Sequence, residues 1–265
     1  MRRWIFFLYG AANHLLFLVV FAYLMGFVGN FLVPKSIDTP GTGTLATAVV
    51  VNLLLLAMFA VQHSVMARPW FKRVWTRIIP QPIERSTYVL ASNIVTVVLM
   101  WQWQGIDRTV WNVELPMLRG LLWGLFVVGW LLVPAVTLLI NHFDLFGTRQ
   151  VWLHLRGREY ESLPFKTPMA YRFVRHPLYI GWAIAFWATP TMTVGHLLFA
   201  GVLTFYMAVA TVFEERDLVA YFGEQYEEYR QRVPRFVPRW SGAVSTIATT
   251  QLKSEPESLR ADITR

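Results

Sequence analysis

Long apolar stretches dominate this chain, and segments rich in charged residues separate them. Four of the stretches are about as long as the roughly 20 helical residues that cross a hydrocarbon layer of about 30 Å. They are Trp4–Val33, Leu45–Ala67, Thr87–Trp103 and Leu118–Ile140. The pattern therefore predicts an all-α integral membrane protein with four transmembrane helices.

A fifth apolar stretch, Leu178–Phe213, contains the turn-forming sequence TPTMT at 189–193. The turn predicts a C-terminal helical hairpin over 178–213, and its first half of about 12 residues covers only about 18 Å. Glu214–Arg232 then carries aromatic and aliphatic residues at spacings of three and four. That spacing predicts one amphipathic helix. The chain beyond Trp240 is polar and is expected to be disordered.

The charge distribution predicts how the chain is oriented in the membrane. Of the 24 Lys and Arg residues, 21 lie in four places: before the first stretch, between the second and third, between the fourth and fifth, and after Phe213. Short loops rich in Lys and Arg stay in the cytoplasm, so both termini are expected there. The net charge of +8 is thus explained by membrane orientation rather than by nucleic-acid binding. Without cysteine, the chain offers no disulfide or thiolate metal site.

The sequence Arg175-His176-Pro177 begins the hairpin, with Tyr171 and Tyr179 close by. Pro177 suits the first turn of a helix, where its missing N–H costs nothing. In isolation, Arg and His before a span are typical of an anchor at the membrane interface. With both tyrosines they offer a guanidinium, an imidazole and two hydroxyls around one helix start, which favours a binding site.

Glu214 and Glu215 end the hairpin, and the hairpin returns them to the Arg175 side of the membrane. Either glutamate could be a helix-start charge or a partner of Arg216. Beside the RHP sequence, a carboxylate could instead accept hydrogen bonds from a diol or an amine, or offset a bound cation. The two segments together predict a charged pocket at the mouth of a membrane protein.

This arrangement resembles the isoprenylcysteine carboxyl methyltransferase superfamily over about residues 150–238. The shared signature is Tyr171, Arg175-His176-Pro177, Tyr179, Gly181, Glu214-Glu215, Leu218, Phe222-Gly223, Tyr226, Tyr229 and Val233-Pro234. The resemblance implies a pocket for S-adenosylmethionine at the cytoplasmic membrane face. It assigns to this pocket Gln150, the stretch Leu163–Lys166 with Leu163 and Phe165, Tyr171, His176, Leu178, Tyr179 and Glu214. Arg175 and Glu215 are predicted to belong to the same charged pocket.

The apolar pattern and the resemblance together predict a division of the chain into three parts. Residues 1–141 are expected to hold the four N-terminal transmembrane helices. Residues 142–240 are expected to form the cofactor-binding region, with the hairpin 178–213 and a cytoplasmic cap. Residues 241–265 are expected to form the disordered tail.

The upstream half of the chain narrows the resemblance. It carries QHSVMAR at 62–68, ERSTY at 84–88 and NHFDLFGTRQ at 141–150. With the C-terminal signature, these segments resemble the bacterial methanethiol S-methyltransferases over about residues 10–240. The resemblance implies S-methylation of methanethiol to dimethyl sulfide in the bacterial inner membrane. The partners are then a small thiol and membrane lipid, with no metal.

Three residues are candidates for the chemistry. His63 lies within or at the end of the second span, where an ionisable group is costly and usually functional. It could be the base that deprotonates the thiol, or a histidine hydrogen-bonded at the interface. His142 could be the base instead, oriented by Asp144, or a helix-end cap. His14 is expected to be a packed hydrogen-bonding group, and the charge of the cofactor could replace a base altogether.

Two alternatives stay open. The first is a methyltransferase of the same fold that acts on a lipophilic carboxylate or amine. In the prenylcysteine branch an arginine one turn before the acidic pair engages the substrate, whereas 205–213 here reads FYMAVATVF and has no charge, which argues against a carboxylate. The second is a non-catalytic transport or denitrification-associated membrane protein. Few buried charges and no clear internal repeat argue against transport.

Overall fold

The structure is a computed structural model that describes residues 1–238. The predicted tail at 241–265 lies outside the described residues. The elements are, in chain order, α1 (Arg2–Gly29), α2 (Leu45–Ala67), α3 (Pro69–Trp75), η1 (Gln81–Ile83), α4 (Glu84–Gln102), β1 (Thr109–Asn112), α5 (Pro116–Ile140), α6 (His142–Leu145), α7 (Thr148–Leu155), η2 (Met169–Arg172), α8 (Pro177–Trp187), β2 (Thr191–Thr193), α9 (Val194–Phe222) and α10 (Glu224–Arg232).

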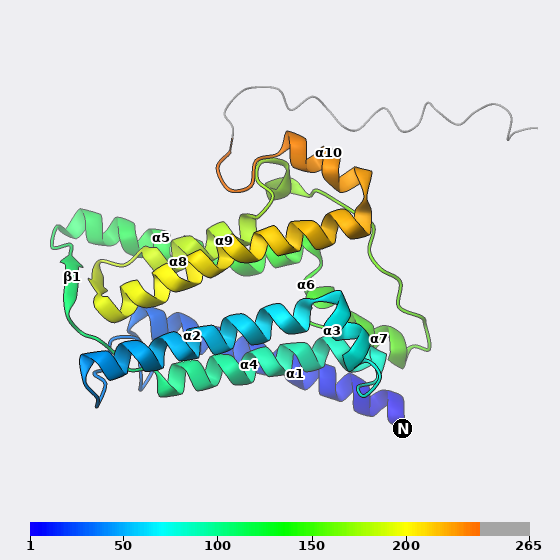
Figure 1. Ribbon diagram of the computed structural model, residues 1–265, viewed down its shortest axis with the longest axis horizontal. Coiled ribbons are helices and arrows are strands. Elements are labelled where there is room, and N and C mark those ends of the chain that lie inside the picture. Colours follow the sequence, from blue (N-terminus) through cyan, green and yellow to red (C-terminus); the bar gives the residue numbers. More distant parts are fainter. Residues whose placement is uncertain (239–265) are drawn as a thin grey trace, which may run out of the picture.

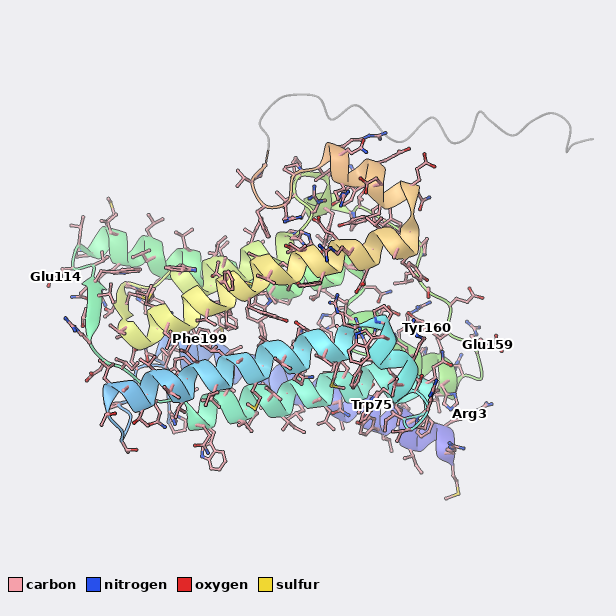
Figure 2. The ribbon with its side chains drawn as sticks, in the orientation of Figure 1. Arg3, Trp75, Glu114, Glu159, Tyr160 and Phe199 are labelled. Atoms are coloured by element: carbon pink, nitrogen blue, oxygen red, sulfur yellow. The ribbon has the colours of Figure 1, made fainter. Side chains whose placement is uncertain are left out.

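The long helices run side by side in two layers (Figure 1). One layer holds α1, α2 and α4, and the other holds α5, α8 and α9. The N-terminus, α3, α6 and α7 lie at one end of these helices, and β1 lies at the opposite end. Figure 2 labels Arg3, Trp75 and Tyr160 at the first end and Glu114 at the other. Segments that the sequence predicts on one membrane side thus share one end of the bundle.

Within residues 1–238, four helices are long and apolar enough to cross a membrane by length and composition: α1, α2, α5 and α9. The prediction of a mostly helical membrane protein is confirmed, but the identity of the four helices differs. The third predicted span forms α4, which is 19 residues long and is not among the four because it carries more polar residues. Instead α9, the second half of the interrupted stretch, extends over 29 residues.

Helix α8 is short and packs closely against α5. Its 11 residues cover roughly 16 Å, about half of a hydrocarbon core. A Cβ placed on Gly129 of α5 would lie 2.5 Å from the backbone N of Ala185. Only glycine lets the two backbones approach this closely. Because α8 also contacts α9, α8 is held against both α5 and α9.

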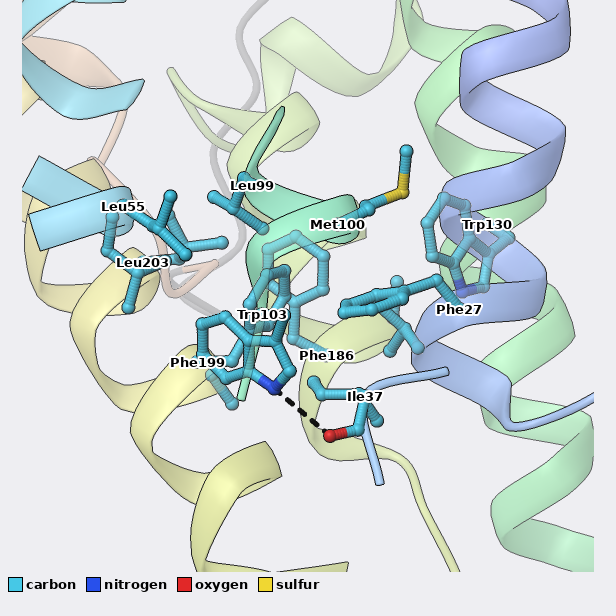
Figure 3. Close-up of a cluster of buried hydrophobic side chains, with 14 of the residues drawn as sticks. Phe27, Ile37, Leu55, Leu99, Met100, Trp103, Trp130, Phe186, Phe199 and Leu203 are labelled. Atoms are coloured by element: carbon cyan, nitrogen blue, oxygen red, sulfur yellow. Dashed lines mark hydrogen bonds between the residues drawn. The ribbon is translucent and has the colours of Figure 1, made fainter. Parts of the chain in front are cut away.

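The apolar core lies between the two layers, toward the end that carries β1. Trp103 is 1% exposed and packs against Phe199 with ring centroids 5.6 Å apart. Its indole N–H donates a 3.0 Å hydrogen bond to the carbonyl of Ile37. Figure 3 shows this cluster with Phe27 and Phe186 around it. The bundle is therefore closed at this end by packed aromatic rings.

Two short strands, which were not predicted from the sequence, pair at the end of the bundle opposite the N-terminus. Strand β1 pairs antiparallel with β2, with Thr109 opposite Thr193 and Asn112 opposite Thr191. The residues interpreted as a simple turn at 189–193 therefore include a strand. They tie the connection between α8 and α9 to the loop that precedes α5.

The predicted amphipathic helix 214–232 is wrong in its extent. Helix α9 continues without a break through Glu214 to Phe222, and α10 begins after Gly223. Gly223 has φ 60° and ψ −132°, a conformation that is open almost only to glycine. The break turns α10 back over the end of α9 (Figure 1).

Candidate active site

A polar cavity of about 470 Å³ opens where the ends of α5, α8 and α9 meet α10 and the segment 163–171. Its volume lies in the range of roughly 300–1,000 Å³ that is usual for small-molecule sites. The predicted cofactor residues that line it are Leu163, Phe165, Tyr171, Arg175, His176, Leu178, Tyr179 and Glu214. The structure thus brings together segments that are well separated in the sequence.

Tyr179 and Glu214 join α8 to α9 on the wall of this cavity. The Tyr179 hydroxyl donates a 2.9 Å hydrogen bond to Oε2 of Glu214. The His176 ring stacks on Tyr179, with centroids 5.5 Å apart and an interplanar angle of 6°. His176 Nδ1 lies 3.8 Å from the same Glu214 oxygen. The Glu214 side chain is still 45% exposed, so a ligand in the cavity can reach its carboxylate.

Glu215, predicted beside Glu214 as a cofactor residue, faces away from the polar cavity. It is 2% exposed and accepts hydrogen bonds from Arg175 Nε at 2.8 Å, His176 Nε2 at 2.9 Å and Arg235 Nη2 at 2.8 Å. Successive residues of a helix point about 100° apart. Glu214 therefore reaches the cavity, while Glu215 holds a cationic cluster behind its wall.

Arg175 fastens the chain that follows α10. Its backbone N–H donates to the carbonyl of Pro234 at 2.9 Å. Its guanidinium donates to the carbonyl of Arg230 at 2.8 Å, to that of Val233, and to Glu215. Although Arg175 lines the cavity, its Nε and Nη1 donate to protein acceptors. We interpret it as an anchor that keeps the α10 segment in place.

Aromatic side chains from α10 close over the polar cavity. The Phe165 ring lies 5.8 Å from that of Tyr226 and 5.4 Å from that of Tyr229. The Tyr229 hydroxyl donates to the carbonyl of Tyr171 at 2.6 Å. Burial raises the pKa of Tyr226 and Tyr229, and burial together with the Glu214 charge raises the pKa of Tyr171. All three phenols therefore stay protonated at neutral pH.

Tyr226 and Tyr229 belong to the signature in the sequence, but neither was predicted as a site residue. Both line the polar cavity, as do Leu218 and Phe222. The signal was their recurrence at three and four residues, which places them on one face of a helix. What the spacing could not give was the turn at Gly223, which directs that face onto the cavity.

A second cavity, of about 200 Å³, lies between the helix layers and is mostly apolar. It is lined by Phe17, Val20, Phe21, Leu24, Phe59, His63, Ser92, Asn93, Thr96, Leu99, Tyr179, Trp182, Phe186, Phe199, Leu203, Tyr206 and Met207. Tyr179 also lines the polar cavity. The two spaces therefore share a wall residue, and groups bound in each would meet near Tyr179.

His63, predicted as a candidate base, lies on the wall of the apolar cavity. Its ring nitrogens lie 2.9 Å and 3.0 Å from the hydroxyl of Tyr88. Ser92 Oγ is 3.4 Å from Nδ1, and the ring of Phe59 stacks on the imidazole at 5.3 Å. Polar neighbours and an aromatic face thus fix the imidazole beside the cavity.

His142 does not pair with Asp144, so that predicted pairing is wrong. His142 Nδ1 lies 2.8 Å from Thr137 Oγ1, and its Nε2 lies 3.1 Å from Nε2 of His14. His14 in turn contacts Thr148 Oγ1 at 2.7 Å, which agrees with its expected packing role. Burial and the neighbouring His14 lower the pKa of His142. His142 is not among the residues that line either cavity.

Asp144 and Gln150 lie at the rim, on α6 and α7. Asp144 lines the polar cavity and accepts from Arg149 Nη1 at 2.9 Å and from the Tyr160 hydroxyl at 3.2 Å. Gln150 Nε2 donates to the backbone oxygen of Asp144 at 3.2 Å. Gln150 is not a lining residue of the cavity, and its contact supports Asp144. In residues 1–238, no three metal-ligating side chains gather, and independence from metal stays a prediction.

The fold and the two cavities define a class of protein: a mostly helical, multi-pass membrane protein that can hold a polar ligand next to an apolar one. Comparison with known proteins gives the particular family. The chain is 51% identical over 238 residues to methanethiol S-methyltransferase from Mycobacterium tuberculosis, covering 90% of this chain and 98% of the relative. It is 51% identical over 231 residues to the protein of the same name from Crocosphaera subtropica, covering 87% and 91%.

More distant similarity extends beyond bacteria. Nurim from Rattus norvegicus is 31% identical over 196 residues, covering 69% of this chain and 72% of the relative. No family model matches the chain, and no solved structure matches it. The chain belongs to the methanethiol S-methyltransferase family.

Proposed function

We propose that this protein transfers a methyl group from S-adenosylmethionine to methanethiol, forming dimethyl sulfide. The observation that carries the proposal is the position of Tyr179, which lines both the polar and the apolar cavity. A polar methyl donor and an apolar thiol could therefore meet within one protein. The names of relatives about 50% identical to this chain supply the substrate.

The polar cavity suits the proposed donor, which supplies a methyl group on a positively charged sulfur. Glu214 offers an accessible carboxylate that can accept hydrogen bonds from hydroxyl or amine groups and balance a positive charge. The rings of Tyr171, Tyr179 and Phe165 offer aromatic faces, which attract cations. We assign donor binding to these residues together with His176 and Leu178.

The apolar cavity suits the proposed thiol. Its wall on the 205–213 turn includes Tyr206 and Met207, and neither side chain is charged at neutral pH. The missing arginine of the prenylcysteine branch is therefore not replaced on this turn. This supports a neutral, apolar acceptor over a lipophilic carboxylate.

His63 is the residue we assign to thiol deprotonation. The thiolate is the nucleophile, so a base beside the cavity accelerates attack. Holding the thiol and the donor in line beside Tyr179 lowers the reaction barrier by several kcal/mol through proximity, because the two reactants no longer have to find each other. His142 is less suited, because it contacts His14 and Thr137 rather than either cavity.

We further propose that the protein lies in the bacterial inner membrane with both termini in the cytoplasm. The end of the bundle that carries the N-terminus, α3, α6 and α7 (Figure 1) is the end that the positive-inside rule assigns to the cytoplasm. Residues 142–176 and 214–240 would then form the cytoplasmic cap over the donor, and α8 with α9 would form the hairpin.

The test is an assay of the purified full-length protein with S-adenosylmethionine and methanethiol. Headspace gas chromatography should detect dimethyl sulfide only when both substrates and the protein are present. A Glu214→Gln variant should form it more slowly. Tight S-adenosylmethionine binding without product would instead indicate a methyltransferase for another acceptor. Neither binding nor product would favour a non-catalytic membrane protein.

A further inference from the structure

The apolar cavity is larger than a one-carbon thiol needs. Its volume is about 200 Å³, and an apolar cavity of about 150 Å³ already holds benzene. A ligand with about six carbon atoms and a sulfur would therefore fit. If methanethiol were the sole substrate, much of this space would stay empty.

The extra space runs along the helix axes. On α1 the lining extends from Phe17 to Leu24, and on α4 from Ser92 to Leu99. Each step of seven residues rises roughly 10 Å. On α8 the lining likewise extends from Tyr179 to Phe186. The cavity is thus an elongated slot whose one end lies at Tyr179.

The two ends of the slot differ in polarity. His63 and Ser92 lie on the half that includes Tyr179, and the opposite half is lined by Leu24, Leu99 and Phe199. A thiol therefore has one favourable orientation, with sulfur toward Tyr179 and hydrocarbon toward Leu99. This orientation also places the sulfur next to the polar cavity.

Packed rings close the far end of the slot. Phe199 is 1% exposed and Leu99 is 3% exposed. Phe199 contacts Trp103 at 5.6 Å and Phe186 at 5.1 Å between ring centroids. Figure 3 shows Leu99, Phe186 and Leu203 around the same cluster. The length of a bound chain is therefore limited by side chains that have little room to move.

We propose that the protein also methylates linear alkanethiols of up to about six carbons, and that Leu99 helps to set the length limit. This inference rests on the proposed function. The thiol proton leaves to a base or to water, the new bond forms between thiol sulfur and the methyl carbon, and the bond from that carbon to the sulfonium breaks. The products are an alkyl methyl sulfide and S-adenosylhomocysteine.

Chain length has a quantitative consequence. Each methylene that enters an apolar site contributes about 0.8 kcal/mol, or about fourfold in affinity. We therefore expect kcat/KM to rise severalfold per carbon from methanethiol onward. It should then fall when the chain exceeds the slot, because the next methylene would overlap the ring cluster.

The experiment measures kcat/KM for straight-chain thiols from one to eight carbons, with purified full-length protein and S-adenosylmethionine. Gas chromatography with mass spectrometry identifies each alkyl methyl sulfide. Leu99→Phe should shift the optimum to shorter thiols, and Leu99→Ala should shift it to longer ones. Leu131→Phe is the matched control, because Leu131 is 63% exposed and lies outside the slot. Ratios between variants cancel the unequal partition of thiols into detergent.

The outcomes separate this inference from the proposed function. If the protein methylates methanethiol but none of the thiols from propanethiol to hexanethiol, the inference is overturned and the proposed function stays intact. Equal length profiles for Leu99→Phe, Leu99→Ala and Leu131→Phe overturn the role of Leu99. Absence of turnover with every thiol overturns the proposed function, and the inference with it.

Discussion

The Tyr179 hydroxyl donates a 2.9 Å hydrogen bond to Glu214 Oε2, and the same tyrosine forms part of the wall of both cavities. The bond holds the Glu214 carboxylate toward the polar cavity. A single contact between α8 and α9 therefore positions a donor-binding group where the two cavities adjoin.

Tyr179→Phe should weaken donor binding while it keeps the aromatic wall. The lost bond to a charged group is worth roughly 1.5–3 kcal/mol, or about 10- to 150-fold in affinity. Isothermal titration calorimetry with S-adenosylmethionine measures the change. Tyr221→Phe is the control, because Tyr221 is 64% exposed on the same helix as Glu214. Equal affinities for the two variants would mean that the hydrogen bond from Tyr179 does not position Glu214 for donor binding.

Glu215→Gln should destabilise the protein. The Glu215 side chain is 2% exposed and that of its partner Arg175 is 9% exposed, so loss of the carboxylate charge leaves a buried guanidinium without its counter-ion. Breaking such a pair costs roughly 3–5 kcal/mol. Thermal unfolding in detergent should show a clearly lower midpoint.

The matched control for this prediction is Glu228→Gln. Its ion pair with Arg232 has side chains 55% and 56% exposed, and exposed pairs contribute at most about 1 kcal/mol. Similar midpoints for the two variants would mean that the cluster around Glu215 does not hold α10 in place.

The prediction from sequence succeeded where a feature depends on local pattern. Runs of about 20 apolar residues predicted helical membrane segments, and the RHP sequence and the acidic pair were predicted to meet. It could not distinguish Glu214 from Glu215. Both are acidic and adjacent, and only the packing of α9 decides which one faces the cavity and which one faces Arg175.

The features that sequence reasoning missed depend on contacts between distant segments. Strand β1 has four residues, too few for a period of two to stand out, and it forms by pairing with β2. His142 and Asp144 are close in sequence, yet Asn141 at φ 157° begins a separate short helix. In that helix the His142 side chain contacts His14, and the Asp144 side chain contacts Arg149.

Stability should fall at mildly acidic pH because of His142. Burial and the neighbouring His14 lower its pKa in the folded protein, whereas the unfolded chain titrates near the ordinary value of about 6.5. Below that pH the unfolded chain binds more protons, so the free energy of unfolding decreases as pH falls. The decrease ends below the folded-state pKa. The midpoint of thermal unfolding, measured from pH 8 to 5, should depend less on pH in His142→Gln.

Membrane topology offers a test that does not involve catalysis. With 21 of the 24 Lys and Arg residues on one predicted side, the positive-inside rule places both termini in the cytoplasm. A reporter fused to the C-terminus should be active in the cytoplasm, and one inserted within 34–44 should be active outside it. The same location for both reporters would contradict the predicted orientation.

His63 and His142 can be separated as candidate bases, because the first lies on the wall of the thiol cavity and the second lies on neither wall. His63→Ala should lose roughly 10²- to 10⁴-fold in turnover, as is usual for a general base. Its affinity for S-adenosylmethionine should change little. The defect should shrink as pH rises, because thiolate then forms without help.

His142→Ala is the comparison, and it should keep most of its turnover and an unchanged pH profile. Turnover is followed as dimethyl sulfide formation from pH 6 to 10, at a saturating concentration of donor. If His142→Ala lost much of its turnover and recovered it at high pH, His142 on α6 would be the base. Near-normal turnover in both variants would exclude either histidine as the base. The positive sulfur of the donor would then be the remaining group able to favour the thiolate, since an opposite charge nearby stabilises the ionised form.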